Sequence, residues 1–151
     1  MATYNSTVGD TALAYTDSHK AYVVKESITL QTEATALTTA GYFAAGDILQ
    51  VFDIPANTFV LAAGLIPTVA EGTTLTYDLG DGTTADGFVD GLSGNATTAA
   101  HSQVAEAYSC DAALGKVYTA TDTLDLKIVT MGAQVSHAAV VTVWMVCFDL
   151  N

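Results

Sequence analysis

Four aspartates between positions 78 and 90 are the residues whose type and spacing could bind a cation: Asp78, Asp81, Asp86 and Asp90. Ca²⁺ takes several hard oxygen ligands, and acidic loops commonly supply them. The spacing does not match an EF-hand loop, and glycine follows Asp81, Asp86 and Asp90. Asp-Gly is favoured in tight hairpin turns because both residues tolerate positive φ. We therefore predict turns and no metal site here, with a bound cation as the alternative interpretation.

Other motifs that carry chemistry are missing from the sequence. The three histidines, His19, His101 and His137, lie far apart and form no pair with the spacing of a zinc site. There is no G-x-S-x-G nucleophile motif and no phosphate-binding loop. The sequence also contains no arginine, the residue that usually clamps anions in a bidentate fashion. We therefore expect a protein that is not an enzyme and binds no cofactor.

The two cysteines, Cys110 and Cys147, do not form a C-x-x-C motif. Cys147 lies in an apolar run, and this surrounding predicts a small buried hydrophobic residue. The sequence leaves open whether the two cysteines pair.

The charge balance bears on the partners. The net charge is −12, and the lysines and arginines together number 4. Binding of nucleic acid requires a basic patch that neutralises phosphates, and docking on anionic lipid requires one as well. No apolar stretch reaches the roughly 18 residues of a membrane span. We therefore expect no nucleic-acid partner and no membrane partner, and an acidic chain of this kind suits the outside of a DNA container.

The composition and the alternation of apolar residues predict an all-β protein. Thr, Val, Ile, Tyr and Phe are plentiful and favour strands. The predicted strands, joined by short turns, cover residues 22–31, 46–55, 58–70, 74–80, 88–89, 116–120, 123–129 and 138–150. Residues 33–46 are expected to hold a short strand or a loop. This pattern is typical of an antiparallel β-sandwich of jelly-roll or related Greek-key type.

Two strands have informative patterns. In residues 46–55, strict alternation predicts that Ile48, Gln50, Phe52 and Ile54 share one face of the strand. The last strand, residues 138–150, is apolar on both faces, which is typical of a strand in the middle of a sheet or between a sheet and a partner. Trp144 on this strand is expected to lie in the core.

The N-terminal residues differ from the rest of the chain. Residues 1–21 lack sustained periodicity and are expected to form a polar arm, and residues 22–151 are expected to form the sandwich domain. The arm packs either on its own domain or on a neighbouring subunit. Tyrosine is enriched at protein interfaces, and Tyr4 and Tyr15 are therefore the candidate interface residues of the arm.

Three segments together resemble small structural proteins of tailed-phage virions, including marine and cyanobacterial phages. They are the run from GDILQVFDIPA to DGFVDG at 46–91, KVYTATDTLDLKIV at 116–129 and VVTVWMVCFDL at 140–150. The resemblance implies a β-sandwich that decorates or cements the capsid, often as a trimer on the shell.

The function implied by this resemblance is structural. The chain is expected to bind the outside of the shell of major capsid protein and to stabilise it, with copies of itself as further partners in a homotrimer on the capsid surface. Two alternatives stay open. One is another virion component, such as a head fibre base, a tail protein or an adaptor, and the other is a calcium- or glycan-binding module for host attachment.

Overall fold

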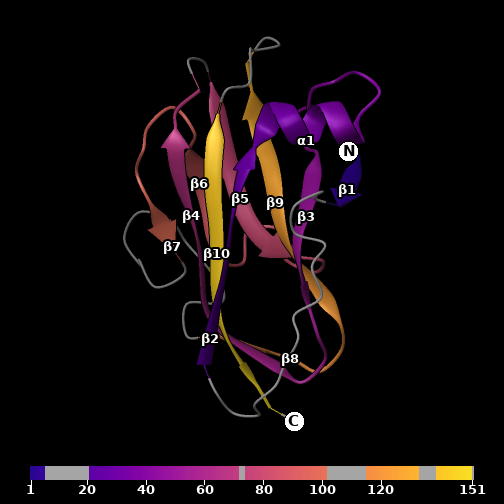
Figure 1. Ribbon diagram of the computed structural model, residues 1–151, viewed down its shortest axis with the longest axis vertical. Coiled ribbons are helices and arrows are strands. Elements are labelled where there is room, and N and C mark those ends of the chain that lie inside the picture. Colours follow the sequence, from indigo (N-terminus) through magenta and orange to yellow (C-terminus); the bar gives the residue numbers. More distant parts are fainter. Residues whose placement is uncertain (6–20, 72–73, 102–114, 133–138, 151) are drawn as a thin grey trace.

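The chain folds into a sandwich of two packed β-sheets, described here from a computed structural model (Figure 1). The structure describes residues 1–5, 21–71, 74–101, 115–132 and 139–150. Among these residues all strand pairs are antiparallel except β1 with β3. The prediction of an all-β antiparallel sandwich is therefore confirmed, while the jelly-roll subtype stays a prediction.

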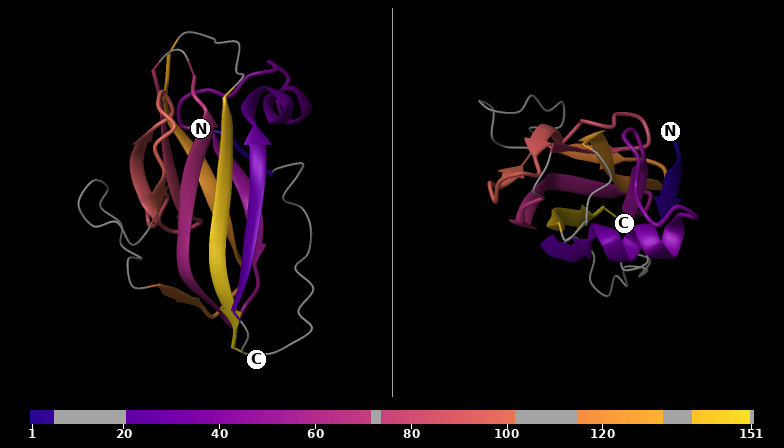
Figure 2. Two further views of the ribbon diagram at one scale, coloured as in Figure 1. Left: turned by 60° about the vertical axis from the view of Figure 1, so that its left-hand side comes forward. Right: turned by 90° about the horizontal axis from the view of Figure 1, so that it is seen from above.

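The strands divide between the two sheets as follows. Sheet A contains, in spatial order, β1 (Thr3–Asn5), β3 (Ile48–Ile54), β9 (Asp122–Met131), β5 (Leu75–Asp81) and β6 (Val89–Ser93). Sheet B contains, in spatial order, β2 (Ala21–Thr29), β10 (Val140–Asp149), β4 (Thr58–Val69) and β7 (Ala100–His101), and β8 (Lys116–Tyr118) also pairs with β4. Figure 2 shows the two layers of strands, and the buried hydrophobic side chains form one core.

Strand β10 lies in the middle of sheet B, between β2 and β4, as its apolar sequence predicts. Alternate residues along it are fully buried in the core: Val141, Val143, Met145 and Cys147. The prediction of a core position for Trp144 is wrong, because its parity places it on the outer face, where it is half-buried. Its neighbours across the sheet are Lys25 of β2 and Gly64 of β4.

A β-bulge in β3 changes which residues of that strand face the core. The register against β9 shifts between Gln50 and Phe52. Leu49 and Val51 are buried before the shift, and Phe52 and Ile54 are buried after it. The prediction that Ile48, Gln50, Phe52 and Ile54 share one face is therefore wrong, because an extra residue in one strand reverses its alternation.

Residues 30–37 form helix α1 (Leu30–Leu37). The prediction of a strand through residue 31 and of a short strand or a loop over residues 33–46 is therefore wrong for these positions. Most residues of the helix, Leu, Gln, Glu and Ala, are good helix formers. The helix covers one end of the sandwich (Figures 1 and 2) and buries Leu30, Glu33 and Ala34. The backbone N–H of Leu30 donates to the carbonyl oxygen of Ala139, which ties the start of the helix to the start of β10. Among the described residues no helix is long and apolar enough to span a membrane.

The first residues of the predicted arm belong to sheet A. Strand β1 pairs in parallel with β3 at the edge of the sheet, and the Ala2 carbonyl accepts a hydrogen bond from the Ile48 N–H. The Tyr4 ring packs on the core, with its centroid 5.8 Å from that of Phe43. These residues therefore lie on their own domain, while Tyr15, with the rest of 6–20, lies outside the described residues. The division into an arm at 1–21 and a domain at 22–151 stays a prediction.

Candidate functional site

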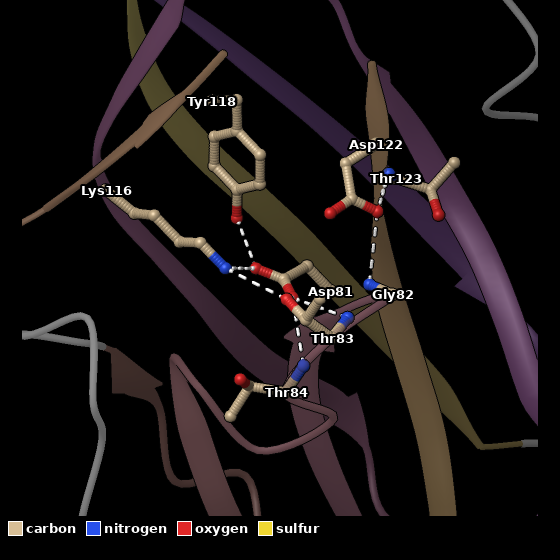
Figure 3. Close-up of polar contacts among 8 residues, drawn as sticks. All are labelled: Asp81, Gly82, Thr83, Thr84, Lys116, Tyr118, Asp122 and Thr123. Atoms are coloured by element: carbon tan, nitrogen blue, oxygen red, sulfur yellow. Dashed lines mark hydrogen bonds and ion pairs between the residues drawn. The ribbon is translucent and has the colours of Figure 1, made fainter. Parts of the chain in front are cut away.

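A polar cluster joins the two sheets at one end of the sandwich. Asp81, the last residue of β5 in sheet A, points its carboxylate toward β8 of sheet B (Figure 3). Its Oδ2 accepts hydrogen bonds from Lys116 Nζ at 2.5 Å and from the Tyr118 hydroxyl at 2.7 Å. The Asp81 side chain is almost fully buried, whereas that of Lys116 is about one-third exposed. This cluster is a cross-link between the sheets made of one carboxylate and two donors.

The other oxygen of Asp81 organises the turn that follows β5. Oδ1 accepts hydrogen bonds from the Thr83 N–H at 2.9 Å, the Thr83 hydroxyl at 2.6 Å and the Thr84 N–H at 3.0 Å (Figure 3). A turn that is held by hydrogen bonds to its own Asp side chain needs no residue with a positive φ.

The predicted reason for the Asp-Gly pairs is therefore wrong in part. Among the six residues of the three pairs, only Gly91 has a positive φ. Gly91 lies inside strand β6 rather than in a hairpin turn.

Hydrogen bonds set the charge of Asp81. Burial alone would raise its pKa, but the hydrogen bonds from Lys116, Thr83 and Tyr118 outweigh burial and hold the pKa well below its usual range. Burial and the bond to Asp81 raise the pKa of Tyr118 well above its usual value. In this cluster Asp81 therefore stays ionised, and its carboxylate faces the neutral phenol of Tyr118 and the ammonium group of Lys116.

The other three aspartates of the predicted acidic cluster lie elsewhere. Asp78 lies on the outer face of sheet A, where Lys127 Nζ donates to Oδ2 at 3.1 Å and the Gly91 N–H donates to Oδ1 at 2.9 Å. Asp86 and Asp90 are exposed. Asp78 and Asp81 therefore point to opposite faces of β5 and pair with different lysines. The described part of the chain contains no group of three or more His, Cys, Asp or Glu residues that could hold a metal ion.

The cysteine and histidine positions add little to a site. Cys147 is a buried free thiol, as its apolar surroundings predict, and burial raises its pKa to about 12. Cys110, His19 and His137 fall outside the described residues.

A cleft of about 410 Å³ lies over the outer face of sheet A. Met1 and Thr3 line it on the side of β1, and Gly82 and Thr83 line it on the side of the turn after β5. Its remaining lining comes from β3, β5 and β9 and from the turn after β5: Ile48, Gln50, Asp81, Ala85, Asp125 and Lys127. The cleft exists because the turn after β5 folds back over the sheet: a Cβ added at Gly80 would lie 1.9 Å from the carbonyl oxygen of Thr84.

Asp125 is the functional candidate that sequence reasoning missed. The alternation of apolar residues over 123–129 indicates only that Asp125 points away from Leu124 and Leu126. It lines the cleft and is 4% exposed. Burial is the main cause that raises its pKa to about 6, repulsion by Asp122 and Asp81 adds to it, and the hydrogen bond from Thr123 opposes it. A buried carboxylate with a raised pKa in a cleft is a signal that appears only in three dimensions.

The outer face of sheet B carries more exposed apolar side chains than that of sheet A, although Lys25, Ser27 and Thr142 also lie on it. The even-numbered residues of β10 share this face with their neighbours across the sheet on β2 and β4. Its exposed apolar members are Val23, Ile66, Val69 and, on β8 opposite Phe59, Val117, and its half-buried ones include Phe59, Trp144, Val146 and Phe148. Several exposed apolar side chains on one face are typical of an interaction site.

Comparison with known proteins finds no match to a protein family and none to a curated protein sequence. Three solved phage structures do contain chains with a similar fold. A chain from the capsid of Ralstonia phage GP4 has 15% identity and a TM-score of 0.69, over 97% of both chains.

The other two similar chains also come from capsid structures. One belongs to the cyanophage Pam1 capsid asymmetric unit, with 15% identity, a TM-score of 0.62 and 91% of both chains covered. The other belongs to the acid-stable capsid structure of Helicobacter pylori bacteriophage KHP30, with 12% identity and a TM-score of 0.55. That match covers 88% of this chain and 91% of the other. At these identities the likeness shows a shared fold.

Proposed function

We propose that this chain is a non-enzymatic structural protein of a phage virion. The observation that carries the proposal is the match with a chain from the capsid of Ralstonia phage GP4, which covers 97% of each chain. Two further chains from phage capsid structures share the fold. Folds alone do not fix function, but the three matches come from structures of one kind of assembly. The lack of a nucleophile or phosphate-binding motif is consistent with a role that depends on binding.

The more specific role that we propose is decoration or cementing of the capsid shell. In this role the chain binds the outside of the major capsid protein and stabilises the assembled shell through binding energy. The net charge of −12 supports an outer position, because packaged DNA repels an acidic chain. The exposed apolar side chains on the outer face of sheet B offer surface that contact with a shell would bury.

The copy number of the chain in purified virions tests this role. We expect a ratio to the major capsid protein that corresponds to hundreds of copies, measured by quantitative mass spectrometry. A ratio of six or twelve copies, typical of ring symmetry about the tail axis, would instead favour a tail, adaptor or head-fibre component. Heads that lack the chain should release DNA at lower temperature than complete heads, and equal release would contradict reinforcement.

A pair of variants tests the contact surface. The double substitution Val23→Thr and Val69→Thr removes apolar surface from the outer face of sheet B while keeping β-branched, strand-compatible side chains. We expect it to weaken binding to heads that lack the chain. Val129→Thr, a matched change at a half-buried position on β9 of sheet A, should bind as the wild type does.

We further propose that the chain acts as a homotrimer, as the resemblance to decoration proteins implies. A closed ring presents identical patches wherever shell subunits meet. Native mass spectrometry of the purified chain and of particle-released protein checks the trimer. For the alternative of calcium-dependent attachment, calorimetry with Ca²⁺ on the wild type and on Asp86→Ala would show heat of binding only in the wild type.

A further inference from the structure

Asp125 is a buried carboxylate that accepts fewer hydrogen bonds than an ionised carboxylate usually does. The Thr123 hydroxyl donates to its Oδ1 at 2.7 Å, and the Gln50 amide in turn donates to the Thr123 hydroxyl at 3.1 Å. No hydrogen bond to Oδ2 comes from the described residues. An ionised carboxylate has about four acceptor sites, and buried charges are normally paired. Among the described residues, one oxygen of Asp125 is therefore left without a donor and can accept a further one.

The lysines nearest to Asp125 are already paired with other aspartates. Lys127, two residues along β9, is bonded to Asp78, and Lys116 is bonded to Asp81. The neighbours of Asp125 across sheet A are Gln50 on β3 and Gly80 on β5, and neither carries a charge. Neither lysine therefore pairs with Asp125.

The cleft above Asp125 is large enough for a side chain from another protein. Its volume of about 410 Å³ lies within the range of roughly 300–1,000 Å³ for small-molecule sites. Thr3 lines one wall of the cleft and Gly82 the other, and Asp125 lines the same cleft. The site therefore combines a buried acceptor, a walled opening and polar flanks.

We propose that this cleft binds an arginine side chain of a partner protein, with the guanidinium donating to the Asp125 carboxylate. Arginine fits better than lysine because a guanidinium is weakly hydrated and donates in a planar fork, so it loses less on entering a half-buried site. The net charge of −12 favours a cationic ligand. This chain contains no arginine. The partner is therefore a different protein and not a second copy of this chain.

The proposal deepens the proposed function, because in a virion the arginine would belong to the protein on which the chain docks. The binding chemistry itself can be tested without any virion. The probe is N-acetyl-arginine methylamide, and its matched control is the citrulline analogue, which has nearly the same shape but no charge. Nuclear magnetic resonance follows the backbone amides of Thr123, Asp125 and Lys127 during titration of the purified chain.

For the wild type we expect saturable shifts with the arginine probe and none with citrulline. Asp125→Asn, which keeps the shape of the side chain, should weaken binding about tenfold or more, as expected for a lost hydrogen bond between charged groups. Asp53→Asn makes the same change in net charge at an exposed position of β3 that does not line the cleft, and it should bind as the wild type does. Equal binding by Asp125→Asn and the wild type, or equal shifts with citrulline, would overturn the proposal.

A measurement on the wild type alone guards against a variant that misfolds. The Asp125 carboxyl carbon is titrated with and without saturating arginine probe, because a bound cation favours the ionised carboxylate. We expect its pKa to fall when the probe is bound, and an unchanged pKa would count against the site.

Binding to heads separates the two proposals. If heads bind Asp125→Asn as tightly as the wild type, the arginine site is wrong and the shell role stands. If the arginine probe binds at Asp125 but heads do not bind the chain, the site stands and the shell role is wrong.

Discussion

Two carboxylates of sheet A, at Asp81 and at Asp125, have the same exposure and opposite surroundings. Each residue is 4% exposed, and they lie on the adjacent strands β5 and β9. Asp81 accepts five hydrogen bonds, including one from a lysine, and its pKa is lowered. Asp125 accepts one, and its pKa is raised to about 6.

The difference shows that the partners of a buried carboxylate, and not its burial, decide what it contributes. At Asp81 the partners satisfy the charge, so the residue cross-links the sheets. At Asp125 the hydrogen-bond partners do not satisfy the charge. The ionised residue therefore lowers the stability of the fold and can still accept a hydrogen bond from a further donor.

Asp81→Ala should have the largest effect. It leaves the Lys116 ammonium and the buried Tyr118 hydroxyl without their acceptor and frees the turn at Thr83. We expect a loss of about 3 kcal/mol in the free energy of unfolding, measured by urea denaturation, since removal of one partner of a buried pair is strongly destabilising. Asp86→Ala, an exposed carboxylate of the same loop, is the control and should stay within about 0.5 kcal/mol of the wild type. Similar values for both would refute the cross-link.

Gly80→Ala should have the next largest effect, because Gly80 lies opposite Asp125 and one residue before Asp81. The new Cβ would collide with the backbone at Thr84 and Ala85 and displace the turn that both carboxylates share. We expect a loss of about 2 kcal/mol, in the range for overpacking of a tight site. In the control Gly87→Ala, the new Cβ comes no closer than 3.3 Å to Thr84, and the change should cost clearly less. An equal cost would contradict the role of the close approach at Gly80.

Asp125 should give the wild type a pH dependence that Asp125→Asn lacks. Its carboxyl ionises near pH 4 in the unfolded chain and near pH 6 in the folded one. A raised folded pKa means that the contribution of Asp125 to stability is complete below about pH 4 and is lost as pH rises through about 6.

Urea midpoints at pH 5 and pH 7 measure this loss. The wild type should lose about 1–2 kcal/mol relative to Asp125→Asn across this interval, somewhat less than the full shift allows. Asp53→Asn should follow the wild type, and parallel curves for wild type and Asp125→Asn would show that Asp125 has an ordinary pKa.

Tyr118→Phe should have the smallest effect, because it removes one of the five hydrogen bonds of Asp81 and keeps the ring. We expect a loss of about 1 kcal/mol in the free energy of unfolding. Tyr4→Phe is the control, since the Tyr4 ring packs on Phe43 and the change should stay within about 0.5 kcal/mol. No difference between the two variants would mean that the phenol does not support the carboxylate.

Much of the fold could be predicted from the sequence wherever the apolar residues of a strand, by their spacing, are the ones that are buried. Strand β10 is apolar at nearly every position, which predicted either the middle of a sheet or a place between a sheet and a partner, and it lies in the middle of sheet B. Leu124, Leu126 and Ile128 on β9 are buried as their alternation predicts. The errors have local causes. The bulge in β3 reversed the face of Phe52, and the two turns of α1 are too short to show a helical period.

The candidate site was much less predictable. Asp81 is recognisable as a turn residue, but its main partners are 35 and 37 residues away on β8. No spacing rule connects such positions, because the packing of the two sheets brings them together. Asp125 reads as an ordinary outward residue of a strand, and only the turn after β5 that covers it makes it a buried acceptor.

The central place of β10 has a consequence for how the chain reaches its native state. The Ser27 and Thr142 hydroxyl oxygens lie 2.8 Å apart although 115 residues separate them in sequence. Strands β2 and β4 have no common neighbour until residues 140–149 have been synthesised, so a nascent chain exposes two open strand edges on the ribosome. Pairing over such long loops is slow, and the order of synthesis therefore makes closure of sheet B a late event that truncated polypeptides cannot complete.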